Sequence, residues 1–303
     1  MVVEKDNVKN MCDRCKSLRP TRLHLYELAR IGELLGNTNK YVDNEDSRLI
    51  KTQELSQWLK LAAELESVQI DTWKFAGVDG TWCRPAAEMY SSDSKHFSTY
   101  STYLTRFIYI YNSLEELYKF LDKHYDAVPK NIRSPSIKCS YLLNNTKDIV
   151  LPDHFWHLSE NYQAFIKQYV DTFGVKIKVD MKFNHKVSFA LDLIRSVRNH
   201  IAHGVFPIAD NPDYSGFGKN EMRLIANLLG HSCRLVALYI QVIFINFNNG
   251  FSEGHHLFID TLNVESVIPF LENHLLTLHL KTDFGLNPSE LSSWEAIQMG
   301  DNY

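Results

Sequence analysis

Apolar residues recur every three or four positions along most of the chain, which is the spacing of amphipathic helices. Stretches rich in glycine or proline, such as residues 77–85 and 128–136, separate the periodic segments. The segments with helical spacing are residues 21–36, 53–76, 97–123, 153–172, 185–203 and 220–247. We therefore expect a mainly α fold in the form of a helical bundle.

One segment follows a different period. Residues 175–182, VKIKVDMK, alternate strictly between apolar and charged side chains. A period of two predicts a short strand, and with it one small β-hairpin in the otherwise helical fold. The charged face of this strand carries Lys176, Lys178 and Lys182.

The domain boundary is expected near residue 90, after the turn-rich stretch GVDGTWCRP (77–85) and at the polar run SSDS (91–94). Residues 1–90 then form an N-terminal helical region of unassigned role. Residues 91–303 form a helical domain with a core at about 95–250 and a C-terminal helical extension. A chain of 303 residues is long enough for one large domain or two smaller ones.

Composition narrows the class of protein. The chain is 45% hydrophobic and 22% charged, as in ordinary soluble globular proteins. A net charge of -4 disfavours general coating of duplex DNA but is compatible with a local basic patch. The N-terminus has no apolar signal core, and the most apolar run, LVALYIQVIFINF (235–247), is too short to span a bilayer. We expect a cytoplasmic protein without membrane contact.

The five cysteines are an odd number in a long chain, so a disulfide framework is not expected. Cys12 and Cys15, in the sequence CDRC, are half of a zinc ligand set, because a structural zinc site needs four ligands. No second CxxC and no HxxxH pair follows, and His24 or Cys83 would be arbitrary partners. Free thiols are the default interpretation, and we expect no metal and no cofactor.

The stretch RSVRNHIAHG (195–204) holds a dense polar cluster within an apolar helical segment. At 100° per residue, the apolar residues between 190 and 201 occupy one arc of about 100°. His200 lies beside this apolar arc. The opposite side of the helix carries Arg195, Arg198, Asn199 and His203.

Arg198 and His203 are five positions apart, which separates them by roughly 140° on an ideal helix. They can act on one atom if the helix breaks and restarts at Asn199, a favoured N-cap residue. Backbone N–H groups at that new N-terminus would also favour an anion. Alternatively, two copies of the motif line one groove.

Residues Arg198 to His203, Arg-Asn-His-Ile-Ala-His, followed by Gly204, resemble the signature of the HEPN superfamily. The resemblance covers about residues 95–250 and implies a helical bundle. Many members are metal-independent ribonucleases of toxin–antitoxin, CRISPR and anti-phage systems. It also implies a homodimer in which two motifs face each other across a composite cleft. An acidic residue often lies on the first core helix of the family, and the helix expected at 97–123 supplies Glu115 at the edge of its apolar stripe.

The residue types suit cleavage of single-stranded RNA by its own 2′-hydroxyl, with 2′,3′-cyclic phosphate and 5′-hydroxyl ends as products. His203 is the expected acid and base, and Arg198 the phosphate clamp. Asn199 would orient His203, and Glu115 would hold Arg198 or His203 in position. Additional positive charge along an RNA path would come from Arg195, Lys176, Lys178 and Lys182.

Several alternatives stay open at this point. The polar cluster could be a solvated helix surface, and the lysines could be the solvent side of an amphipathic strand. The pair Arg195 and His200 repeats the same spacing, with its histidine against the apolar face. As a whole, we expect an endoribonuclease acting as a toxin or anti-phage effector, with an antitoxin or a defence complex as a further partner. The alternatives are a non-catalytic dimeric module of HEPN type that binds RNA or nucleotide or assembles a complex, and a helical scaffold without a site.

Overall fold

The computed structural model describes residues 12–38, 52–247 and 275–281, and within these ranges the chain is mainly helical. This confirms the expected fold class. Most of the expected C-terminal extension lies outside the described residues. The helices are α2 (Asp13–Lys16), α3 (Thr21–Thr38), α4 (Gln53–Glu64), α5 (Val78–Trp82), α6 (Arg84–Phe120), α7 (Pro135–Asn145), α8 (Phe155–Phe173), α9 (Phe189–Ala202) and α10 (Gly218–Phe247), with 3₁₀ turns at Thr72–Phe75 and Leu121–Ala127.

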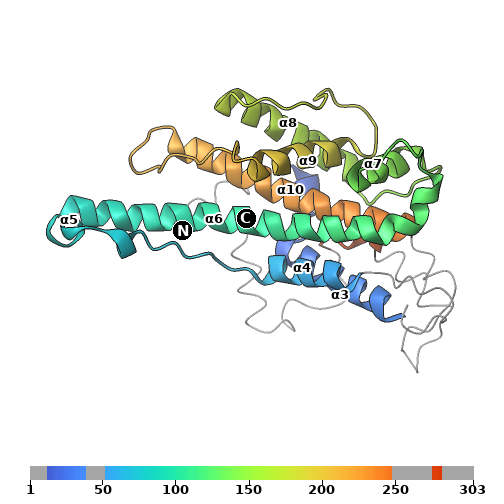
Figure 1. Cartoon of the computed structure of the whole chain (residues 1–303), viewed down its shortest axis with the longest axis horizontal. Helices are drawn as coiled ribbons and strands as arrows, with labels where there is room; N and C mark the ends of the chain where they lie inside the picture. Colours follow the sequence, from blue (N-terminus) through green and yellow to red (C-terminus); the bar gives the residue numbers. More distant parts are fainter. Residues whose placement is uncertain (1–11, 39–51, 248–274, 282–303) are drawn as a thin grey trace.

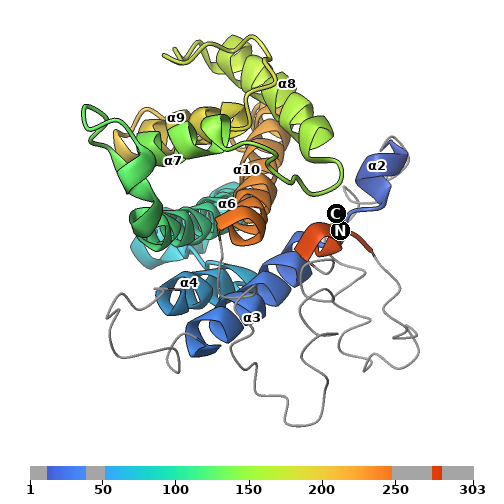
Figure 2. The ribbon, with the colours of Figure 1, turned by 90° about the vertical axis from the view of Figure 1, so that its right-hand side faces the viewer.

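Helix α6 separates two groups of helices. It lies between α3 and α4 on one side and the layer of α7, α8, α9 and α10 on the other (Figures 1 and 2). Its C-terminal half carries the apolar stripe that the sequence predicts, because the side chains on that face are buried. They are Phe107, Ile110, Tyr111, Leu114, Leu117 and Tyr118. This stripe brings α6 against α10.

Helix α10 is the central helix of the core, and between residues 232 and 244 every side chain is buried. It is long and apolar enough to cross a membrane, but 83% of its most apolar stretch is buried by the rest of the fold. Its side chains also fix neighbouring helices. The Tyr239 hydroxyl donates to the carbonyl of Val187 (2.6 Å) and accepts from the N–H of Leu191 (3.1 Å), which holds the first turn of α9.

Two of the expected helices have other bounds. The segment expected to be helical over 53–76 is helical only to Glu64, after which the chain becomes extended. The extended part runs beside α6, whose side chains satisfy its backbone. Thr102 accepts from the N–H of Val68 (2.9 Å), and Arg106 donates to the carbonyl of Leu65 (2.6 Å). Side chains of a neighbouring helix thus replace the hydrogen bonds that a longer α4 would have made internally.

The helix expected over 97–123 begins much earlier, at Arg84, with Pro85 in its first turn, where a missing N–H costs nothing. The expected boundary near residue 90 therefore falls inside a continuous helix.

The expected strand at 175–182 does not form, and the described residues contain no β-strand. The segment is extended but has no partner strand. Its alternation is nevertheless real, because the apolar residues pack against the core while Lys176, Lys178 and Lys182 are exposed. The period-two pattern here indicates a segment whose alternate side chains pack on a helical core, and such packing needs no hydrogen bonds to a second strand.

Two histidines are fully buried where α3 and α10 meet residues 275–281. The rings of His24 and His279 lie 6.1 Å apart between centroids. His24 bonds the side chain of Gln241, and Nε2 of His279 bonds the carbonyl of Asp153 (2.7 Å). Burial lowers the pKa of His24 well below its usual value and that of His279 to about 4, and the nearby Arg234 charge lowers both pKa values further. Both imidazoles are therefore neutral in the folded state.

We expect the free energy of unfolding to fall as the pH is lowered from about 6.5 towards 4. In this window the unfolded chain binds a proton at His24 and His279 and the folded chain does not, so acid favours unfolding. Each histidine contributes about 1.4 kcal/mol per pH unit. Urea unfolding followed by circular dichroism between about pH 7 and pH 5 measures the slope. His279→Gln should give a shallower slope, and a stability independent of pH would contradict the assignment.

Candidate functional site

The polar motif lies at the C-terminal end of α9, and the helix is continuous through it. No break forms at Asn199, which was one of the two expected routes to a shared site. Instead the helix ends at Ala202, and His203 is its C-cap, with its N–H bonded to the carbonyl of Asn199 (3.0 Å). Gly204 then adopts a φ of +67°, a left-handed conformation that favours glycine and turns the chain away from the helix axis.

Arg198 is held against α6. Its guanidinium carbon lies 5.3 Å from the centre of the Tyr111 ring, and its Nη1 donates to Asn199 Oδ1 at 3.5 Å. Among the described residues no carboxylate forms an ion pair with Arg198. Its remaining N–H groups are therefore available to an anion.

Glu115 lies near this guanidinium, on the turn of α6 that follows Tyr111. Partial burial raises the pKa of Glu115, and the positive charge of Arg198 opposes that rise. The carboxylate is therefore within electrostatic reach of Arg198 but outside ion-pair distance. Glu115 was expected to hold Arg198 or His203 in position, and in the described residues it makes no hydrogen bond or ion pair with either.

Arg195 forms an ion pair within the fold. Its Nη2 lies 3.0 Å from Asp192 Oδ1, and the same carboxylate accepts hydrogen bonds from Ser140 (2.9 Å) and Ser188 (3.1 Å). This network joins α9 to α7 and to the loop before α9. The charge of Arg195 is largely balanced within the fold, so its expected contribution to an RNA path is smaller than that of Arg198.

His203 is exposed, and its imidazole makes no hydrogen bond within the described part of the chain. Asn199 was expected to orient this ring, but its side-chain oxygen accepts from Arg198 instead. The structure therefore brings Asn199 to Arg198, and no described residue positions the ring of His203.

His200 has a different role. Its Nδ1 bonds the hydroxyl of Tyr169 (3.0 Å), and its Nε2 bonds the carbonyl of Lys176 (3.1 Å). Because both ring nitrogens are occupied by the fold, the alternative pair of Arg195 and His200 is not free for catalysis. The same bond fastens the exposed lysine segment to α9, which places Lys176 close to the motif helix.

No family model matches the chain, and no curated protein or solved structure is significantly similar to it. The functional interpretation therefore depends on the geometry of the motif itself. Within the described residues, that geometry offers a guanidinium without an ion-pair partner on α9 and an exposed imidazole at the C-cap of the same helix, and these groups can bind a phosphate and transfer a proton.

A second cluster lies away from α9. The CDRC sequence approaches the first turn of α8, where His157 faces both Cys12 and Cys15. Neither of the two partners considered from the sequence takes part, since His24 is buried beside Gln241 and Cys83 lies at the N-cap position of α6. Sequence spacing could not identify His157, because 142 residues separate it from Cys15.

Proposed function

We propose that the protein is a metal-independent endoribonuclease of HEPN type that cleaves single-stranded RNA, acting as a toxin or an anti-phage effector. The observation that carries the proposal is the position of the Arg198 guanidinium and the groups around it. This guanidinium is fixed over Tyr111, has Glu115 nearby, and has no ion-pair partner in the described part of the chain. Arg198 is half-buried, and a guanidinium held in place on a helix with N–H groups left over can bind a phosphate through two hydrogen bonds.

The proposed reaction is attack by a 2′-hydroxyl on the adjacent phosphate. His203 removes the proton from the attacking hydroxyl or delivers one to the leaving 5′-oxygen. Arg198 binds the phosphate and stabilises the charge that develops in the transition state. Neither role needs a metal ion.

The proposal requires two chains in one site. Arg198 lies on the continuous α9 and His203 is its C-cap, and by ideal helix geometry the two side chains point about 140° apart, which disfavours their meeting at one phosphate in one copy. A homodimer with facing motifs would pair the arginine of one chain with the histidine of the other. The loop after the motif supports association, since Val205 is 52% exposed and Ile208 is 65% exposed.

The test is incubation of the purified chain with single-stranded RNA and with DNA of the same sequence, without added divalent metal. We expect RNA to be cut, leaving 2′,3′-cyclic phosphate and 5′-hydroxyl ends, and DNA to remain intact because it lacks the attacking hydroxyl. The His203→Ala variant is purified in parallel to reveal any contaminating ribonuclease.

Cleavage of the DNA strand, or products with 5′-phosphates, would contradict the proposed chemistry. Binding of RNA without cleavage would instead favour a non-catalytic dimeric module, in which Arg198 holds a phosphate and no proton is transferred. A monomer in solution under conditions where RNA is cut would exclude the composite site.

A further inference from the structure

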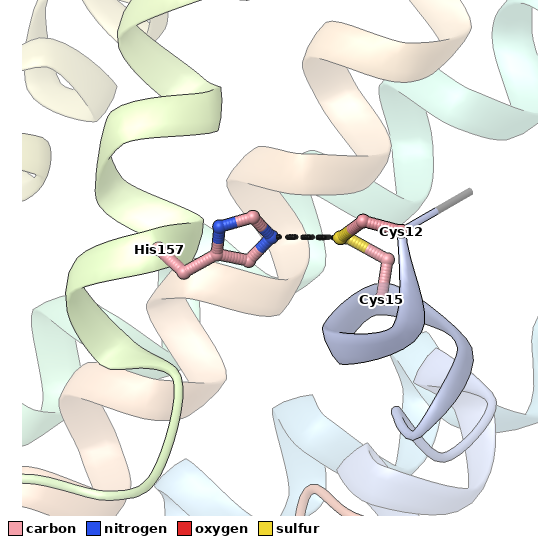
Figure 3. A group of neighbouring side chains, drawn as sticks. All are labelled: Cys12, Cys15 and His157. Atoms are coloured by element: carbon pink, nitrogen blue, oxygen red, sulfur yellow. Dashed lines mark hydrogen bonds between the residues drawn. The ribbon is translucent and has the colours of Figure 1, made fainter. Parts of the chain in front are cut away.

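Cys12, Cys15 and His157 converge on one point although they come from opposite parts of the sequence. Nε2 of His157 lies 3.1 Å from Sγ of Cys12 and 3.4 Å from Sγ of Cys15, and all three atoms lie within 4.8 Å of one another. Figure 3 shows the imidazole of α8 pointing directly at the two sulfur atoms of the α2 turn.

The fold holds the two sides of this cluster in place. The chain after α2 pairs with the C-terminal described segment through a bridge between Leu18 and Leu280 and a hydrogen bond from the N–H of Arg19 to the carbonyl of His279 (2.8 Å). On the other side, Ser17 bonds His154, the residue just before α8, at 3.3 Å. The convergence is therefore built into the packing of α2 against α8.

We propose that Cys12, Cys15 and His157 bind a zinc ion. Two thiolates from a CxxC turn and one imidazole are preferred zinc ligands, and three such ligands leave one position of the tetrahedron for a water or another donor. Bonds of about 2.3 Å to sulfur and 2.0 Å to nitrogen, at the tetrahedral angle, require sulfur–nitrogen separations of about 3.5 Å. The present separations of 3.1 and 3.4 Å reach that value by side-chain shifts of about half an ångström.

The surroundings favour the ligand forms of His157 and Cys12 and oppose that of Cys15. Burial, and then the charge of Arg14, lower the pKa of His157, so the imidazole is neutral at neutral pH and can bind a metal. A hydrogen bond from the backbone of Cys15 lowers the pKa of Cys12, whereas burial and the neighbouring Cys12 raise that of Cys15 to about 11. A bound zinc ion would offset the raised pKa of Cys15, since a divalent cation stabilises two adjacent thiolates. Each thiol that binds the ion releases its proton to solvent.

The Asn161 side chain contacts two of the proposed ligands, and its Nδ2 lies 3.1 Å from Nε2 of His157, a contact that zinc binding would replace. The same Nδ2 lies 3.7 Å from Sγ of Cys15, where it can donate to a thiolate. Such a donor to a metal-bound sulfur fixes the ligand and tunes the site. The consequence of zinc binding would be mechanical, because the ion would tie the N-terminal segment to the first turn of α8.

The experiment is metal analysis of the full-length chain, purified under reducing conditions without chelator. We expect about one zinc per chain, a stoichiometry set by one ligand cluster. Cys12→Ser, Cys15→Ser and His157→Ala should each lose most of it. The matched controls are Cys83→Ser and His203→Ala, which alter the same residue types far from the cluster and should keep the metal.

Two measurements guard against a misfolded variant. Cobalt added in place of zinc should give the thiolate-to-metal charge-transfer absorption and the visible bands of a tetrahedral site. His157→Cys, which keeps a ligand at that position, should still bind zinc. A wild-type chain that carries no zinc and gives no cobalt–thiolate absorption would overturn the proposal, as would equal metal loss in Cys83→Ser and Cys12→Ser. The cluster shares no residue with the RNA site, so either proposal can fail alone.

Discussion

Replacement of His203 by alanine is expected to slow RNA cleavage at least about 100-fold, because a positioned acid or base contributes roughly 10² to 10⁴ to the rate of proton transfer. The fold should be unaffected. The imidazole is exposed and makes no hydrogen bond in the described residues, so its removal creates neither a cavity nor an unpaired buried group. Initial rates on end-labelled single-stranded RNA measure the loss, and thermal unfolding checks the fold.

The matched control is His185→Ala, which removes another exposed imidazole that the proposed mechanism does not use. Its cleavage rate should equal that of the wild type. Cleavage by His203→Ala at the wild-type rate would remove His203 from the site and leave the motif as a helix surface.

The helical fold was predictable because an amphipathic period reports which face of a helix is buried. The buried residues of α9 include Ala190, Leu193, Ile194 and Val197, the same face that the 100° projection selects. Helix ends were less predictable. Residues 65–71 have no breaking residue of their own, and α4 ends at Glu64 because the side chains of α6 offer the following backbone its hydrogen bonds.

The local sequence also misled where one pattern fits two structures. Alternation at 175–182 fits an edge strand and also fits an extended segment packed on helices, and only the tertiary fold decides between them. At Asn199, the preference of asparagine for N-cap positions favoured a break in the helix, but an N-cap forms only where a helix begins. The side-chain oxygen of Asn199 accepts a hydrogen bond from Arg198 instead, and α9 continues through Asn199.

The two candidate sites differ in how much of them the sequence contained. The proposed RNA site comprises residues of α9, its C-cap His203 and Glu115, so periodicity was enough to group its charged residues. The contact with Tyr111 was missed because this tyrosine counts as a core residue, although it lies four residues before Glu115 on the same face of α6. The zinc cluster depends on a tertiary contact between α2 and α8, which no local pattern encodes.

Replacement of Arg198 by alanine is expected to lower the rate of RNA cleavage about 10²- to 10³-fold, the usual cost of removing one preorganised donor to a transition-state anion. Arg198→Lys should recover part of this rate, because lysine keeps the charge but loses the two parallel hydrogen bonds that a guanidinium makes to a phosphate. Stability should change little, since Arg198 contacts only the Tyr111 ring and Asn199 among its described partners. Equal rates for the alanine variant and the wild type would contradict the phosphate role.

Mixing the two inactive variants tests whether the arginine and the histidine of one site come from different chains. In a dimer formed by one Arg198→Ala chain and one His203→Ala chain, one composite site carries both substitutions and the other carries none. If half of the dimers are mixed, cleavage returns to about a quarter of the wild-type rate. If each site were built within one chain, every site in the mixture would lack one group and no activity would return. The continuous α9 predicts recovery, because it separates Arg198 from His203 of the same chain.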